Sequence, residues 1–306
     1  MYKPKYITYI LNMKNKIFLV LSLIFMILLF INMPIINESV ITACKLFVTR
    51  VYPSLLPMLI ICDILLYFDL PLLFANTLGK FFKIIFHSSS YGPFIFIISL
   101  FSGAPTNVYV LKKLYLEKKI SLNEANKFLR FSYFANPLFL YTMLTFIFKD
   151  NKKLILPIFI MPYIVNILIG IFSRKTIDIA LLDNKTIKED FGTYFINSIK
   201  NAMNTLLMIL GVITIFYIIG SLINPSKNII LTGLLELTSG LYELGTKSIN
   251  LSLKALLAII FINFGGLSIH LQVKGIISDT LISYLSFLKG RVLATIISII
   301  LFFLIQ

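Results

Sequence analysis

Two polar, helix-breaking stretches interrupt the apolar sequence of this chain: Phe101-Ser102-Gly103-Ala104-Pro105-Thr106-Asn107-Val108-Tyr109 and Phe264-Gly265-Gly266-Leu267-Ser268-Ile269-His270-Leu271-Gln272. They lie in different halves of the chain, and each places glycine beside hydroxyl and amide side chains. Interrupted apolar segments at corresponding positions of two halves are typical of transporters that bind a solute near the middle of the membrane. The pair therefore predicts a transporter-like site built from broken helices.

The composition indicates an integral membrane protein. Of the 306 residues, 58% are hydrophobic and 13% are charged, which is more apolar surface than one soluble core can hide. The sequence therefore predicts an all-α polytopic protein in contact with the lipid bilayer. The net charge of +15 does not indicate a nucleic-acid partner, because the basic residues are spread through short loops between apolar segments.

Six apolar segments are long enough, or nearly so, to cross about 30 Å of hydrocarbon: 17–33, 53–68, 127–147, 154–172, 198–223 and 291–306. Two further segments, 71–86 and 229–246, mix apolar with polar residues, as helices that lie in the membrane interface do. The segments 92–117 and 252–286 contain the two polar stretches and are predicted to be re-entrant helical hairpins.

The basic residues Lys3, Lys5, Lys14 and Lys16 precede the first span and predict a cytoplasmic N-terminus. Six crossings then return the C-terminus to the cytoplasm, which makes a multi-pass protein of the cell membrane. The predicted units 53–147 and 198–306 each run span, interfacial helix, hairpin, span, and enter the membrane from opposite sides as inverted repeats. The first repeat follows an N-terminal span and connector, 1–52, and a linking span and cytoplasmic loop, 148–197, joins the two repeats.

The first apolar segment has two interpretations. It resembles a retained span or signal anchor, and a cleaved secretion signal shares its basic start and apolar core. The two cysteines, Cys44 and Cys62, both lie in apolar settings, so we expect packing residues and no disulfide framework or thiolate metal site.

Several ordered motifs resemble the YlbJ sporulation integral membrane proteins, over nearly the whole chain after the first span. They are Tyr52-Pro53-Ser54-Leu55-Leu56-Pro57, Ser102-Gly103-Ala104-Pro105-Thr106-Asn107, Ile120-Ser121-Leu122-Asn123-Glu124-Ala125, Phe134-Ala135-Asn136-Pro137-Leu138-Phe139 and Gly265-Gly266-Leu267-Ser268-Ile269-His270-Leu271-Gln272-Val273. That family carries the Gate, or nucleoside-recognition, domain, which is similar to parts of concentrative nucleoside transporters, SpmA, SpmB and FeoB. The resemblance implies a role in spore cortex formation in a sporulating Gram-positive cell. It does not imply nucleosides as substrates.

The polar residues of the two hairpins are the candidate substrate-binding residues. A helix interrupted in lipid leaves backbone groups that must face protein, water or ligand, and a half-helix N-terminus attracts oxygen atoms of a ligand. The alternative is that the same side chains only satisfy the broken backbone and hold the hairpins together. The candidates are Ser102, Gly103, Thr106 and Asn107 in the first hairpin and Gly265, Gly266, Ser268, His270 and Gln272 in the second.

Three residues outside the hairpins are further candidates. Asn136 precedes Pro137 inside the predicted span 127–147, where proline is expected to kink the helix and Asn136 to meet a freed carbonyl or a ligand. The acids Asp63 and Glu236 lie in apolar surroundings and are candidates for coupling to a cation or proton. For Asp63 the alternative is a helix-packing role, and for Glu236 a solvated place on an interfacial helix.

No motif indicates an enzyme or a bound cofactor. A P-loop, a dinucleotide fingerprint and a serine-hydrolase elbow are all absent from the sequence, so transport would be gradient-driven or passive. The two histidines, His87 and His270, lie far apart in sequence, and His270 with Gln272 and Ser268 is too poor a ligand set to predict a metal site.

The favoured function is alternating-access transport of a small polar solute bound between the two hairpin tips. The rival hypotheses are a non-transporting membrane scaffold or assembly factor for spore envelope synthesis, and lipid handling in the same cavity. The sequence leaves two kinds of protein partner as alternatives: further copies of this chain in a homo-oligomer, or other spore membrane proteins.

Overall fold

The computed structural model describes residues 13–89, 91–173, 190–224 and 228–305. Lys3 and Lys5, which set the predicted orientation, and most of the predicted cytoplasmic loop, 174–189, lie outside the described residues. The first half contains α2 (Met13–Ile31), α3 (Met33–Leu46), a π-helical turn (Phe47–Val51), α4 (Tyr52–Tyr67), α5 (Leu70–Phe86), α6 (Gly92–Ser102), α7 (Thr106–Leu116), α8 (Leu122–Phe131) and α9 (Pro137–Ile147). The second contains a 3₁₀ turn (Lys152–Leu154), α10 (Ile155–Phe172), α11 (Phe191–Ile223), α12 (Ile229–Leu235), α13 (Leu237–Thr246), α14 (Leu251–Phe264), α15 (Gly266–Ile276) and α16 (Tyr284–Ile305).

The prediction of an all-α polytopic membrane protein is confirmed. Four helical segments of the described chain are long and apolar enough to cross a membrane: Lys152–Phe172, Phe191–Ile223, Leu251–Ile276 and Tyr284–Leu304. Two bent pairs would raise the number to six: Lys16–Ile31 with Met33–Thr49, bent by 95°, and Leu55–Tyr67 with Leu70–Phe86, bent by 81°.

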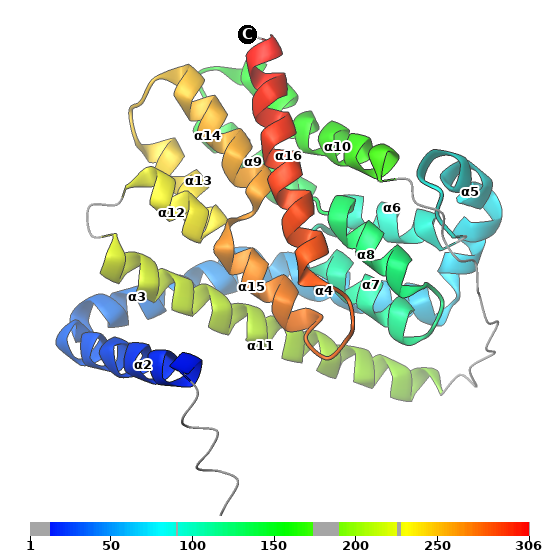
Figure 1. Cartoon of the computed structure of the whole chain (residues 1–306), viewed down its shortest axis with the longest axis horizontal. Helices are drawn as coiled ribbons and strands as arrows, with labels where there is room; N and C mark the ends of the chain where they lie inside the picture. Colours follow the sequence, from blue (N-terminus) through cyan, green and yellow to red (C-terminus); the bar gives the residue numbers. More distant parts are fainter. Residues whose placement is uncertain (1–12, 90, 174–189, 225–227, 306) are drawn as a thin grey trace, which may run out of the picture.

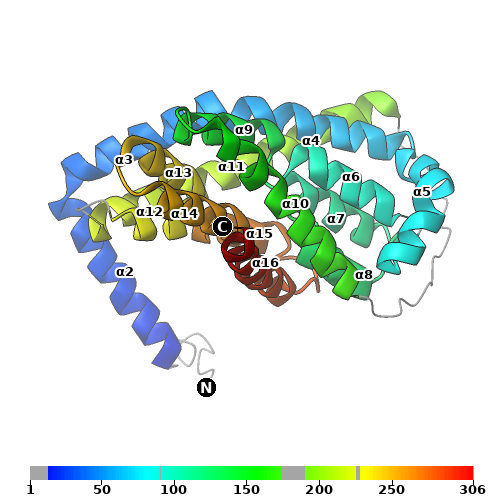
Figure 2. The ribbon, with the colours of Figure 1, turned by 90° about the horizontal axis from the view of Figure 1, so that it is seen from above.

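The 33-residue helix α11 runs along one side of the molecule and contacts α3, α4 and α15 (Figure 1). Small and aliphatic residues on its buried face, such as Ala202 and Leu206, pack against Ala43 and Leu59 of the N-terminal helices. By contrast, α2 extends away from the other helices, as seen from above in Figure 2, and its apolar side chains are largely exposed. This exposure suits contact with lipid tails.

The first predicted hairpin is present. Helix α6 ends at Ser102 and α7 begins at Thr106, and the two helices contact each other. Gly103 allows the turn because its φ of 69° lies in the left-handed region, which side chains with a Cβ rarely adopt.

The predicted continuous span 127–147 is wrong. Helix α8 ends at Phe131, residues 132–136 are not helical, and α9 begins at Pro137. Proline disfavours helical backbone in the residue before it, and Asn136 accordingly has ψ 126°. Pro137 therefore starts a helix here and does not kink one.

The predicted second hairpin, 252–286, is also wrong. Helices α14 and α15 are separated at Gly265 but continue as one interrupted candidate span of 26 residues, and α16 makes the return (Figure 1). The hairpin of this half is formed by α12 and α13, within the segment 229–246 that was predicted to be interfacial. Their backbones touch, since a Cβ on Gly240 would lie 2.2 Å from the Cα atom of Gly233, and such glycine contacts let helices approach closely.

The same order of elements therefore occurs twice. A hairpin (α6–α7, then α12–α13) is followed by an interrupted helix (α8–α9, then α14–α15) and by a long helix (α10, then α16). The contacts of the two long helices correspond: α16 packs against α8, and α10 packs against α14. The assignment of the unit boundaries 53–147 and 198–306, and their inversion across the membrane, stay predictions.

Candidate functional site at four helix breaks

Four interruptions within the described helices meet near the centre of the molecule. The first break is 103–105, between α6 and α7, and the second is 132–136, between α8 and α9. The third is at Glu236, between α12 and α13, and the fourth is at Gly265, between α14 and α15. In each half the hairpin break lies against the break of the interrupted helix that follows it.

The first and second breaks are joined by hydrogen bonds. The amide of Ala104 donates to the carbonyl of Phe134 at 2.9 Å, and Asn136 Nδ2 donates to the Ser102 carbonyl at 3.4 Å. A Cβ on Gly103 would lie 2.5 Å from the Asn136 nitrogen, so glycine is needed for this approach. Asn136 Oδ1 accepts from the amides of Leu138 and Phe139 at 3.0 and 3.1 Å and so caps α9.

The third and fourth breaks repeat this arrangement. A Cβ on Gly266 would lie 2.9 Å from the Leu237 nitrogen. The carboxylate of Glu236, only 6% exposed, caps α13 by accepting from the amides of Thr238 and Ser239 at 3.1 and 2.7 Å. The positive end of the helix dipole stabilises this buried negative charge. Glu236 therefore belongs to the site and does not lie on a solvated helix face.

The two halves meet where Tyr133, in the second break, lies over Gly265, in the fourth. Beside this contact is a cavity of about 100 Å³ whose walls include all three residues 236–238. Its other break residues are Ala104, Pro105, Tyr133, Ala135 and Asn136, and α15 adds Ile269 and Gln272. Apolar residues of α11, including Ile209 and Ile213, close the remaining side.

Several buried polar atoms around the breaks have no hydrogen-bond partner among the described residues. They are Thr106 Oγ1, Asn107 Oδ1, Tyr133 Oη, Asn263 Oδ1 and Ser268 Oγ. A buried polar atom without a partner is costly, and a bound water or ligand group would remove that cost. Tyr133 lines the cavity, and the other four residues are close to a break in sequence. This clustering at the breaks favours a polar occupant there.

Other predicted residues are occupied by the protein itself. The Ser102 hydroxyl donates to the Ile98 carbonyl at 2.7 Å, so it satisfies its own helix. His270 Nε2 lies 3.1 Å from the Phe264 carbonyl, which can only accept, so Nε2 donates. In the neutral ring Nδ1 then accepts from the Tyr284 hydroxyl at 2.9 Å. Asn107 Nδ2 donates to the Ser132 carbonyl at 2.5 Å and ties the first hairpin to the second break.

The sequence interpretation missed Arg291. The predicted span 291–306 begins at this residue, but α16 begins seven residues earlier, at Tyr284, and places Arg291 inside the protein with 0% exposure. Its guanidinium lies 4.3 Å from the Tyr133 ring centre, and Nη2 donates to Asn166 Oδ1 at 2.7 Å. A charged residue within an apolar helix was the available signal.

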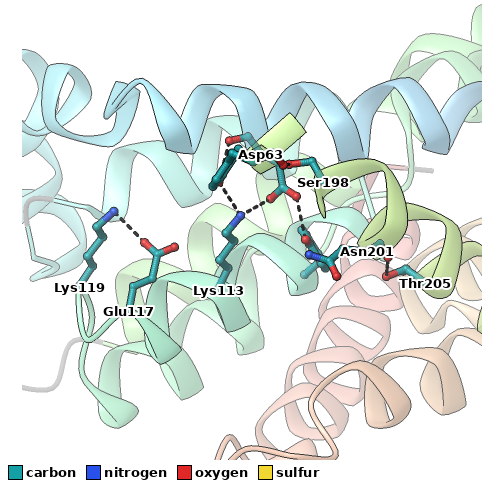
Figure 3. A network of polar contacts seen from close by, with 9 residues as sticks. Asp63, Lys113, Glu117, Lys119, Ser198, Asn201 and Thr205 are labelled. Atoms are coloured by element: carbon teal, nitrogen blue, oxygen red, sulfur yellow. Dashed lines mark hydrogen bonds and ion pairs between the residues drawn. The ribbon is translucent and has the colours of Figure 1, made fainter. Parts of the chain in front are cut away.

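Asp63 lies in a separate polar network between α4, α7 and α11 (Figure 3). Its side chain is 1% exposed, and Oδ1 pairs with Lys113 Nζ at 2.7 Å. Asp63 Oδ2 accepts from the Tyr109 hydroxyl at 2.9 Å, and Lys113 also donates to the Tyr194 hydroxyl at 2.7 Å. The predicted buried acid is therefore paired, and it does not touch the four breaks.

Three cavities follow one another along α11. A cavity of about 450 Å³ is lined by Asn201, Asn204 and Thr205 together with Lys112 and Lys113 of α7, and we call it the basic vestibule. The central cavity follows at Ile209, Ile213 and Tyr217. Next comes a cavity of about 430 Å³, the acidic vestibule, lined from Phe216 to Asn224 of α11 and by Glu38, Glu236 and Glu243.

The length of this row matches a membrane. From Asn201 to Asn224 the helix covers about 35 Å at roughly 1.5 Å per residue, comparable with a hydrocarbon core of about 30 Å. A single helix thus connects two polar vestibules through the site at the breaks.

Within the described residues, no three side chains of His, Cys, Asp or Glu are grouped to hold a metal ion.

Comparison with known proteins shows that the chain is similar to a bacterial membrane protein. It is 26% identical over 289 residues to the sporulation integral membrane protein YlbJ of Bacillus subtilis (strain 168), covering 79% of this chain and 71% of the relative. No family model matches the chain. No solved structure matches it either.

Proposed function

We propose that this protein transports a small polar solute across a membrane of a sporulating cell, and that the solute binds at the four helix breaks. The observation that carries the proposal is a cavity lined by residues of three breaks, with the fourth break against Tyr133 in its wall and buried polar atoms without partners around the breaks. Non-helical backbone is tolerated in a membrane where it lines a site of this kind.

The breaks offer suitable chemistry for polar ligands. Helices α7, α9, α13 and α15 each begin directly after a break. Asn136 caps α9 and Glu236 caps α13, whereas α7 and α15 have no side-chain cap. The first amides of a helix have no partner within it, so the N-termini of α7 and α15 can donate to oxygen atoms of a solute. Asn107 and Ser268 supply unpartnered side-chain oxygens for its donors.

The row of cavities supplies a path. The basic and acidic vestibules admit polar molecules from either end, and the small central cavity separates them. Movement of the interrupted helices would open the centre to one vestibule at a time, which is alternating access. Asp63 and Glu236 are the candidates for coupling to an ion gradient; with neither coupled, transport is passive. The cytoplasmic placement of both termini remains part of this proposal.

The proposed setting is sporulation, which the similarity to a sporulation integral membrane protein supports. Within sporulation, we propose a role in spore cortex formation. A membrane scaffold for envelope synthesis or a lipid-handling protein would keep the same fold without needing a polar solute at the breaks. Within this proposal the protein acts without a catalytic step, and homo-oligomers or other spore membrane proteins are its expected partners.

The test is complementation of a strain in which the native gene is deleted. Asn107→Ala removes a polar side chain beside the first break, and Gln272→Ala removes one that lines the cavity. Asn32→Ala, between α2 and α3, is the matched control. We expect normal membrane abundance of all three variants by immunoblot, with cortex restored by the control alone. Full restoration by Asn107→Ala and Gln272→Ala would reject the solute site and favour the scaffold.

A further inference from the structure

Arg291 carries a fully buried charge that the proposed binding site does not use. Its side chain is 0% exposed, and its hydrogen-bond and aromatic partners among the described residues include no carboxylate. An isolated cation in an apolar interior is strongly unfavourable unless other groups replace water. The groups around the guanidinium must therefore stabilise the charge.

Two backbone carbonyls at the ends of two different helices face the guanidinium. Nη1 donates to the carbonyl of Asn263, the last residue but one of α14, at 3.3 Å. Nη2 donates to the carbonyl of Arg130, the last residue but one of α8, also at 3.3 Å. The final carbonyls of a helix lack partners within it and form the negative end of its dipole, so both helix ends stabilise the cation.

The planar shape of the side chain suits this double role. Arginine presents several donors in a fixed fork, whereas a lysine ammonium is a point charge. The α16 backbone is also pressed against α8, because a Cβ on Gly290 would lie 1.9 Å from the Arg130 oxygen. One side chain thus bonds to the ends of both interrupted helices, directly before the second and fourth breaks.

Arg291 also fixes the residue that joins these breaks. The Tyr133 ring lies on the guanidinium at 4.3 Å, a cation–π contact. Asn166 accepts from Arg291 at 2.7 Å and donates to the Tyr133 carbonyl at 2.8 Å, so it holds the backbone beneath the ring. The Tyr133 hydroxyl then reaches Gly265 and the central cavity.

We propose that Arg291 is a positioning residue that couples the two interrupted helices, so that the second and fourth breaks open and close together around the solute. The inference rests on the proposed function only in taking the central cavity as the solute site. Its mechanical part, the coupling of the two breaks, is independent of any solute.

Hydrogen–deuterium exchange of the purified full chain in detergent tests the coupling without a ligand. Arg291→Met keeps much of the side-chain volume but removes the charge and all donors. We expect amide exchange to become about tenfold faster or more, both at 132–136 and at 264–269, since hydrogen bonds to charged groups are among the stronger ones. Ile297→Ala, also in α16 and packed against the core, controls for general loosening of that helix.

Faster exchange at one break only, or at both breaks but no faster than in Ile297→Ala, would overturn the proposal. If Arg291→Met does not accumulate, Arg291→Lys is judged by the same comparison, because its ammonium keeps the charge but loses the fork. The exchange experiment can contradict the coupling without contradicting the proposed function. The proposed function is tested separately, by complementation in cells with the Asn107 and Gln272 variants.

Discussion

The hydroxyl of Tyr133 lies against Gly265, at the point where the interrupted helices of the two halves meet. A Cβ added to Gly265 would lie 2.5 Å from the Tyr133 oxygen, and the φ of Gly265 is 91°. Both steric access and backbone conformation therefore require glycine. The contact makes the fourth break sensitive to a single methyl group.

We expect Gly265→Ala to lower the thermal midpoint of the purified protein by several degrees and to abolish complementation. The physical cost is about 1 kcal/mol or more for the left-handed backbone, with the clash added to it. Tyr133→Phe in the same chain should recover part of the loss, because it removes the nearest atom. Gly211→Ala is the control, since a Cβ there meets nothing within 4 Å; equal effects of both alanine variants would contradict the prediction.

The ion pair of Asp63 with Lys113 should behave as a buried unit. Asp63→Asn or Lys113→Met alone leaves one charge unpaired, at a cost of about 3–5 kcal/mol. The loss of unfolding free energy in the double variant should be smaller than the sum of the losses in the two single variants, as measured by chemical or thermal unfolding in detergent. Lys119→Met breaks the more exposed pair with Glu117 and should change stability by about 1 kcal/mol or less. Additive single effects would show that the Asp63 pair contributes no coupling.

The cap of α9 separates stability from function. Asn136→Ala removes the cap oxygen and should cost about 1 kcal/mol, whereas Asn136→Ser keeps a cap. Asn250 Oδ1 caps α14 in the same way, by accepting from the amides of Ser252 and Leu253 at 2.9 and 3.3 Å, at the end of α14 away from the fourth break. Asn250→Ala removes this cap. We expect similar losses of thermal stability from both alanine variants, but a loss of cortex only from Asn136→Ala. Normal cortex in that variant would remove Asn136 from the site.

Asp279 predicts a pH dependence at the basic vestibule. A hydrogen bond from Lys112, with a salt-bridge distance of 2.7 Å, lowers the pKa of Asp279 below its ordinary value. A lowered folded-state pKa favours the ionised form, so the pair stabilises the fold above about pH 4 and is lost as pH falls through the lowered pKa. The difference in thermal midpoint between wild type and Asp279→Asn should be constant above pH 4 and shrink below it. A difference that grows on acidification would have the wrong sign.

Local chemistry was sufficient to locate two of the breaks. Gly103 and Gly265 stop helices because of their own backbone freedom, and the surrounding apolar runs predicted membrane helices. The sequence Asn136-Pro137 also indicated a disruption of the helix. Whether the proline kinks a continuous helix or begins a new one depended on the backbone conformation of the residues before it. A proline can kink a helix or begin one, and the extended backbone of Asn136 decides for the second outcome.

The partners of each break were not predictable from the sequence. The first hairpin was matched with 252–286 because both contain glycine and polar residues, yet the structure forms the second hairpin at 229–246. The close approach of Gly233 and Gly240 makes this fold possible, and it involves a contact between two helices, which no local pattern contains.

The sequence by itself determined that this is a helical membrane protein with helix-breaking polar stretches at Gly103 and Gly265, because composition and backbone preference act residue by residue. Only the tertiary structure decided that three breaks line one cavity with the fourth beside it, that Asp63 pairs with Lys113, and that Arg291 is buried between two helix ends. Those outcomes depend on how distant segments compensate one another's unpaired dipoles and charges, and such compensation exists only once the helices have packed.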